Sequence, residues 1–223
     1  MVRLLSEKSN VAWFKLAEFV ERKEKERALS IYRLLVHSLN DSAYTAQLEG
    51  DLFAAFHDDR AIESYRRAAQ FYEESDRYLP AALVYERMAV LQHTSDEVCD
   101  SWKRSFALYQ LLGYEAKMTR SACALVCVYG AQGQCAQAQE FLQTCALAQA
   151  KCAAVHAEFL LSLLIYHGKT LSETISSDYM IKQLEMVLEL YYDADSPITS
   201  FLTRLHIISP SLHEHACVYL QTH

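Results

Sequence analysis

The sequence predicts an all-α protein built from helical repeats, on three observations. Hydrophobic residues make up 52% of the chain and charged residues 22%, which is ordinary for a globular protein that buries a core. Only 5 glycines and 3 prolines are available for turns, too few for a β-sandwich or barrel of 223 residues. The good helix formers Ala, Leu, Glu, Gln, Arg and Lys dominate instead, and apolar residues recur at helical spacing along nearly the whole chain.

Short polar or glycine-containing joints divide this pattern into about eleven or twelve expected helices. Asn10 is expected to cap the first helix, and Pro80 to open another as a first-turn proline. Residues 40–42 and 57–59 are two of the joints. In chain order the expected helices cover residues 10–23, 28–39, 43–56, 61–74, 81–92, 94–113, 114–129, 134–150, 152–167, 177–192, 197–208 and 210–221.

Two segments, residues 28–92 and 114–150, share a spacing of small and large residues that fits the tetratricopeptide pattern. Ala28 and Tyr32 recur 33 residues later as Ala61 and Tyr65. A small residue lets the two helices of a hairpin approach closely, and an aromatic ring fills the gap to the next hairpin. We therefore expect Ala61, Ala81 and Ala138 to be buried at helix crossings. The sequence predicts one domain over residues 1–223, in which C-terminal helices over 177–222 follow these repeats.

The repeat register is irregular, because the helix over 61–72 serves as the second helix of one hairpin and the first of the next. In this respect the chain resembles the soluble NSF attachment protein (SNAP) class, whose members are tetratricopeptide-like α-solenoids of antiparallel helix hairpins.

Within that class the chain resembles the family of the forty-kilodalton huntingtin-associated protein, also called the factor VIII intron-encoded protein family. The matching stretches follow in the same order over residues 10–12, 81–83, 121–125, 138–141, 151–152, 160–164 and 212–221. From the sequence we expect the chain to differ from the vertebrate form, without its proline-rich insertion and its N-terminal extension. The resemblance implies a protein that binds and stabilises huntingtin, a large helical-repeat protein, in a heteromeric complex. It also implies a link to early endosomes through a Rab GTPase, and a cytoplasmic, endosome-associated and nuclear location.

Charge and cysteine content exclude several other classes. The net charge of −7, from 21 basic and 28 acidic residues, argues against a nucleic-acid partner. The longest apolar-leaning stretch, residues 159–166, is too short to cross a bilayer, so no integral membrane segment is expected. The seven cysteines are odd in number and form no CxxC pair, which favours free thiols in a reducing compartment such as the cytoplasm.

No pattern predicts a catalytic, cofactor or metal site. No glycine-rich nucleotide loop is present, and no cysteine lies in a glycine-flanked turn typical of a nucleophile. His213 and Cys217 share one helix face while His215 points away, which makes a poor zinc site.

Two features are candidates for binding a protein partner. Glu185, Glu189 and Asp193 follow at steps of four and form an acidic stripe on one helix side, which Asp195 extends into the next turn. This stripe is either a solvated face or a docking edge for a basic surface. The helix that contains Phe159, Leu163 and Tyr166 is apolar around nearly its whole circumference, so it lies at the centre of the array or is covered by a partner.

We therefore predict a non-catalytic scaffold that binds a large protein. Two other classes stay open. One is a SNAP-like adaptor that recruits an ATPase to membrane-fusion complexes, or a bacterial tetratricopeptide adaptor. The other is an enzyme whose site has no recognisable motif.

Overall fold

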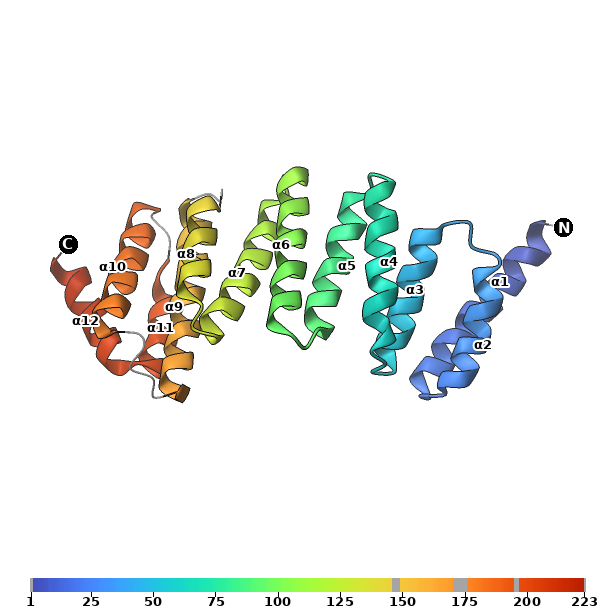
Figure 1. Ribbon diagram of the computed structural model, residues 1–223, viewed down its shortest axis with the longest axis horizontal. Helices are drawn as coiled ribbons and strands as arrows, with labels where there is room; N and C mark the ends of the chain where they lie inside the picture. The colour runs from blue at the N-terminus through green and yellow to red at the C-terminus, as the bar shows by residue number, and fades with distance from the viewer. Residues whose placement is uncertain (1, 146–148, 171–175, 195–196, 223) are drawn as a thin grey trace. The chain divides into compact units, whose positions relative to one another are not determined.

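The computed structural model describes residues 2–145, 149–170, 176–194 and 197–222. Twelve helices and no strand occur in these ranges (Figure 1), which confirms the all-α, helical-repeat prediction. The helices are α1 (Val2–Glu21), α2 (Lys25–Val36), α3 (Ser42–Ala55), α4 (Arg60–Glu74), α5 (Tyr78–Leu91), α6 (Ser95–Leu112), α7 (Glu115–Ala131), α8 (Cys135–Thr144), α9 (Gln149–Thr170), α10 (Ser177–Asp193), α11 (Thr199–Ile208) and α12 (Pro210–Thr222).

Contacts within the chain divide it into two compact units, Met1–Leu108 and Tyr109–His223, with the division inside α6. Each helix of a repeat array contacts mainly its neighbours, so a division of contacts does not by itself separate domains. The single domain expected from the sequence therefore stays a prediction.

Small residues hold the first unit together. Ala61 and Ala81 are buried, as the repeat pattern predicted, and Ala28 is buried as well. Gly50 of α3 leaves room for the ring of Tyr65 on α4, because a methyl group at Gly50 would lie 2.6 Å from that ring. Helix α4 packs against both α3 and α5, as the irregular register of the sequence indicated.

A second device in this unit is a carboxylate shared by a tyrosine and an arginine from the next two helices. Asp51 on α3 accepts a hydrogen bond from the hydroxyl of Tyr65 on α4 at 2.6 Å, and pairs with Arg87 on α5. The arrangement recurs one helix further on with Glu73 on α4, Tyr85 on α5 and Arg104 on α6. Burial and the carboxylate together raise the pKa of Tyr85 to about 12. Each carboxylate thus ties three successive helices together.

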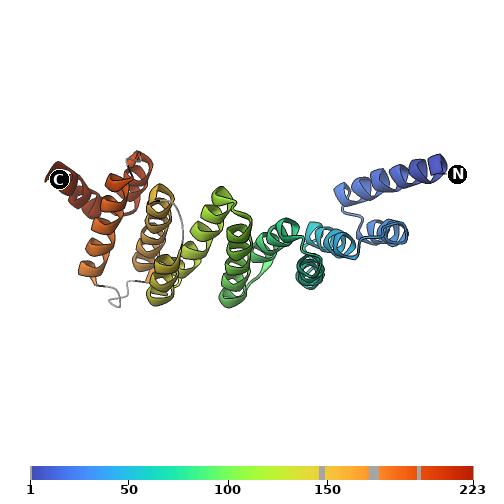
Figure 2. The ribbon, with the colours of Figure 1, turned by 90° about the horizontal axis from the view of Figure 1, so that it is seen from above.

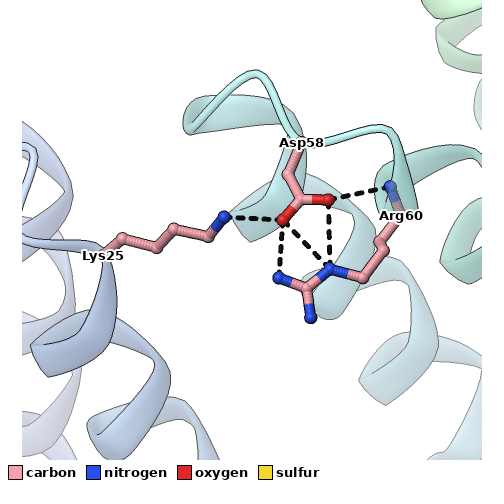
Figure 3. Close-up of polar contacts among 3 residues, drawn as sticks. All are labelled: Lys25, Asp58 and Arg60. Carbon is pink, nitrogen blue, oxygen red and sulfur yellow. Dashed lines mark hydrogen bonds and ion pairs between the residues drawn. The ribbon is translucent and has the colours of Figure 1, made fainter.

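Asp58, in the turn between α3 and α4, is the centre of a polar cluster in the first unit (Figure 3). Its carboxylate accepts from the Lys25 ammonium of α2 at 2.6 Å and from the Arg60 guanidinium at 2.6 Å, and it also accepts from the Arg60 backbone N–H at 3.0 Å. These hydrogen bonds hold the pKa of Asp58 well below its usual range. The cluster fastens the start of α2 to the α3–α4 turn.

The second unit is built around α9. Helix α7 packs along α9, while α10, α11 and α12 enclose a further apolar cluster on it. Gly133 provides the left-handed residue of the α7–α8 turn, with φ of 66°. Figures 1 and 2 show α10 and α12 beside each other toward the C-terminus, in agreement with their contacts.

Several helix boundaries differ from the prediction; α2, for example, begins at Lys25 and α9 at Gln149, each three residues earlier than expected. Asn10 is no cap, because it lies inside α1. Helix α8 ends at Thr144, since Cys145 takes an extended conformation there, so the expected helix over 134–150 was too long. Pro80 lies in the first turn of α5, as predicted, although the helix begins earlier than expected, at Tyr78. Proline costs no hydrogen bond there, because first-turn N–H groups have no partner within the helix.

Candidate protein-binding face on α10 and α12

Helix α10 is the element that presents the acidic stripe. It starts at Ser177 because the Ser176 side chain caps it, accepting a hydrogen bond from the Tyr179 N–H at 3.2 Å. Its inward side chains, Met180, Gln183, Leu184, Val187 and Leu188, are buried. This 3-4 spacing fixes the rotation of the helix and turns the remaining positions outward.

The structure places the three described carboxylates of the stripe in different surroundings. Glu189 and Asp193 are exposed, whereas Glu185 is partly buried. The Glu185 carboxylate lies 3.4 Å from Nε2 of His215 on α12. Glu189 accepts a hydrogen bond from the Tyr219 hydroxyl, also on α12, at 3.2 Å. Asp195, the fourth predicted member, lies outside the described residues.

Two apolar side chains share this outward face, and sequence reasoning missed both. Met186 is 41% exposed and Tyr192 is 74% exposed. Met186 lies three residues before Glu189, and Tyr192 three residues after it, so all three project on the same side of the helix. The sequence does contain a signal for both residues. They are large side chains next to the acidic stripe, and their positions do not fit the 3-4 spacing of the residues that α10 buries. Tyrosine and methionine are enriched in protein interfaces.

The apolar helix predicted as a binding element turned out to be internal. Phe159 and Leu163 have no exposed surface, so neither can contact a partner, and their assignment as contact residues was wrong. Their burial follows from the close approach of α7 to α9, on which both lie. Tyr166 is partly buried, and its ring covers Gly133 in the α7–α8 turn. Of the two readings of this helix, the central position in the array is the one observed.

The histidines of α12 divide as the helix periodicity predicted. His213 lies 3.7 Å from the Cys217 sulfur and packs edge-on against His206 of α11, with ring centroids 4.7 Å apart. His215 points to the other side, toward α10. In the described part of the chain no three His, Cys, Asp or Glu side chains are grouped in a way that could hold a metal ion.

The Cys123 and Cys145 thiols have properties opposite to those of a catalytic nucleophile. All seven cysteines are free. Burial raises the pKa of Cys123 to about 12 and that of Cys145 to about 11, which keeps both protonated near neutral pH. Burial also lowers the pKa of His156, which favours the neutral imidazole. A thiolate nucleophile requires a lowered thiol pKa instead.

Each unit contains an open cleft in its described part. One, of about 610 Å³, runs between α2, α3 and α4 and is crossed by the Glu49–Arg67 ion pair. The other, of about 430 Å³, is enclosed by α9, α10 and the start of α12, with Leu164, Met180 and Leu212 among its lining residues. His215 borders the second cleft, so the contact with Glu185 forms part of its wall.

Comparison with known proteins gives no match, either to a protein-family model or to a curated protein sequence. None of the helices in the described ranges is long and apolar enough to cross a membrane.

Proposed function

We propose that this chain is a non-catalytic scaffold that binds and stabilises a large helical-repeat protein, which the sequence resemblance names as huntingtin. The same resemblance proposes a role on early endosomes through a Rab GTPase, within a cytoplasmic and nuclear heteromeric complex. The observation that carries the binding role is the outward face of α10, where Met186 and Tyr192 lie exposed beside Glu189 and Asp193.

This combination of side chains suits a basic surface with an apolar centre. The carboxylates steer a basic partner toward the face and fix its orientation, and they contribute more to association rate and specificity than to affinity. The rigid Tyr192 ring and the adaptable Met186 side chain supply apolar contact area, which the carboxylates of this face do not supply. The partner chemistry is therefore a helical surface that presents Lys or Arg around an apolar pocket.

The test is capture of huntingtin co-expressed with charge-reversed variants. Glu189→Lys combined with Asp193→Lys removes two exposed carboxylates of the face. Glu21→Lys combined with Glu140→Lys changes the net charge equally at two exposed positions on α1 and α8. We expect the first pair to slow capture strongly at low salt and the control pair to leave it near the wild-type rate.

A third variant separates the apolar contact from the charges. Tyr192→Ala truncates a side chain that is 74% exposed, so it leaves the fold intact, and we expect it to increase the dissociation rate. Equal capture by the wild type, the Glu189/Asp193 pair and Tyr192→Ala contradicts this binding face. Recovery of a membrane-fusion ATPase in place of huntingtin favours the SNAP-like adaptor function.

A further inference from the structure

Helices α10 and α12 meet through two polar contacts with the same step. His215 and Tyr219 are one turn apart on α12, and they reach Glu185 and Glu189, one turn apart on α10. The residue numbers increase in the same direction in both pairs, so the two helices run alongside each other in parallel register over this turn. The contact therefore engages two neighbouring carboxylates of the acidic stripe at once.

The rest of α12 is attached through the ring contact of His213 with His206 on α11 and through a small apolar contact area. Among its described residues Ala216 is the buried one, and Leu212 and Tyr219 are partly buried and pack against the apolar cluster of the second unit. Val218 and Leu220 remain 61% and 38% exposed. An element with so little buried apolar surface belongs to the low-stability part of a fold and opens locally at low cost.

We propose that α12 is an autoinhibitory strap on the partner-binding face. This inference rests on the proposed function, because it concerns how the same carboxylates become available to a basic partner. While α12 is docked, His215 and Tyr219 satisfy Glu185 and Glu189. A partner that presents Lys or Arg at one-turn spacing replaces these contacts with charge-assisted hydrogen bonds, which are stronger than those of a neutral hydroxyl. Only a surface with matching spacing exchanges both contacts together, so the strap excludes isolated cationic groups.

Tyr219→Phe and His215→Ala release the strap without disturbing the α10 core. The first substitution removes the hydroxyl that reaches Glu189 and keeps the ring that packs on the apolar cluster. The second removes the imidazole and leaves alanine, a good helix former. Tyr192→Phe is the matched control, since it removes the hydroxyl of an exposed α10 tyrosine.

The first measurement is amide hydrogen exchange of residues 213–222 in the free protein. A hydrogen bond contributes about 1 kcal/mol, so we expect the exchange rates to rise about fivefold in Tyr219→Phe and further in the double variant. Tyr192→Phe should leave them unchanged. Unchanged exchange in the double variant overturns the strap.

The second measurement is binding of a synthetic helical peptide with lysines four residues apart, at low ionic strength. We expect the double variant to bind this peptide several-fold more tightly than the wild type does, and Glu189→Lys/Asp193→Lys to abolish the gain. Faster exchange of α12 with no gain in peptide binding overturns the autoinhibitory role. Failure of the proposed function can be distinguished from failure of the strap. If only the proposed function is wrong, Glu189→Lys/Asp193→Lys does not change huntingtin capture, but the strap-release variants still change amide exchange and peptide binding.

Discussion

Gly130 of α7 lies so close to Ser162 of α9 that a methyl group on Gly130 would come within 2.6 Å of the Ser162 Cβ. The same methyl group would lie 3.0 Å from the backbone nitrogen of Leu163 and 3.0 Å from the carbonyl oxygen of Phe159. Because two of these atoms belong to the backbone, no side-chain rotation relieves the contact. The absence of a side chain at Gly130 thus sets the α7–α9 distance at which Phe159 and Leu163 are buried.

We predict that Gly130→Ala destabilises the protein although alanine is the better helix former. The helix-propensity gain is about 1 kcal/mol, whereas overpacking a close contact costs about 1–3 kcal/mol or more. Gly168→Ala is the matched control, since a methyl group at Gly168 of α9 meets no atom within 4 Å. Urea unfolding followed by circular dichroism should show a lower midpoint for Gly130→Ala and an equal or higher one for Gly168→Ala. A midpoint for Gly130→Ala above that of Gly168→Ala contradicts the close packing.

Most of the fold could be predicted because helix formation and apolar spacing are local properties of the sequence. The starts of α3, α4, α6 and α7 fall within one residue of the predicted ones for that reason. Asn10 shows the limit, since a good capping residue inside a helix looks the same in sequence as one at its start. The small residues Ala61, Ala81 and Ala138 were recognised as buried because the repeat pattern places them at helix crossings.

Long-range pairing in the candidate site could not be predicted. The step of four between Glu185 and Glu189 is visible in the sequence, but their contacts with His215 and Tyr219 cross 30 residues and two connecting segments. Nor does the chain show which apolar residues are covered: Phe159 is buried and Tyr192 exposed, although both are aromatic residues in apolar-rich helices. The difference in burial depends on which helices pack against each residue, and the spacing of residues in the sequence does not define that packing.

We predict that Asp58→Asn lowers the free energy of unfolding by about 1–2 kcal/mol, because an amide cannot form the charge-assisted hydrogen bonds that join α2 to the α3–α4 turn. Asp59→Asn is the control at the neighbouring position, since the Asp59 side chain is 90% exposed and makes no capping hydrogen bond. Thermal unfolding should separate the two variants. Equal effects of both substitutions would assign the cost to the turn in general rather than to the Asp58 cluster.

The Asp58 cluster also makes stability depend on acidity. Its hydrogen bonds from Arg60 and Lys25 lower the pKa of Asp58 in the folded chain below the ordinary value of 3.8. A carboxyl group with a lowered folded-state pKa stabilises the fold above the unfolded-state pKa, and that contribution is lost as the pH falls further. We expect the stability difference between the wild type and Asp58→Asn to be constant from pH 7 to about pH 5, and to shrink below pH 3.8. A difference that grows on acidification contradicts this assignment.

We predict that Ala138→Leu costs about 1–3 kcal/mol by overpacking the second unit, because Ala138 has no exposed surface. Ala136→Leu provides the control on the same helix, since Ala136 is exposed, and its effect should stay within about 0.5 kcal/mol. Urea unfolding of the two variants and the wild type measures both changes in stability. Similar midpoints for the two leucine variants would show that α8 adjusts its position to accommodate the larger side chain.

Thiol reactivity should report on the α7–α9 packing, because Cys123 lies two helical turns before Gly130 and therefore on the same side of α7. Burial raises the pKa of Cys123 to about 12, so at pH 8 almost none of this thiol is present as the reactive thiolate. We predict that iodoacetamide modifies Cys123 in the native protein on the order of a thousandfold more slowly than in urea, where the pKa returns to about 8.5. Mass spectrometry of the peptides measures this ratio, and Cys145, with a pKa of about 11, should show a smaller ratio in the same direction. Gly130→Ala provides the link to the first prediction: by separating α7 from α9 it should increase the native modification rate of Cys123. Rapid native alkylation of Cys123 in the wild type would contradict its burial and would favour an enzyme with a thiolate nucleophile.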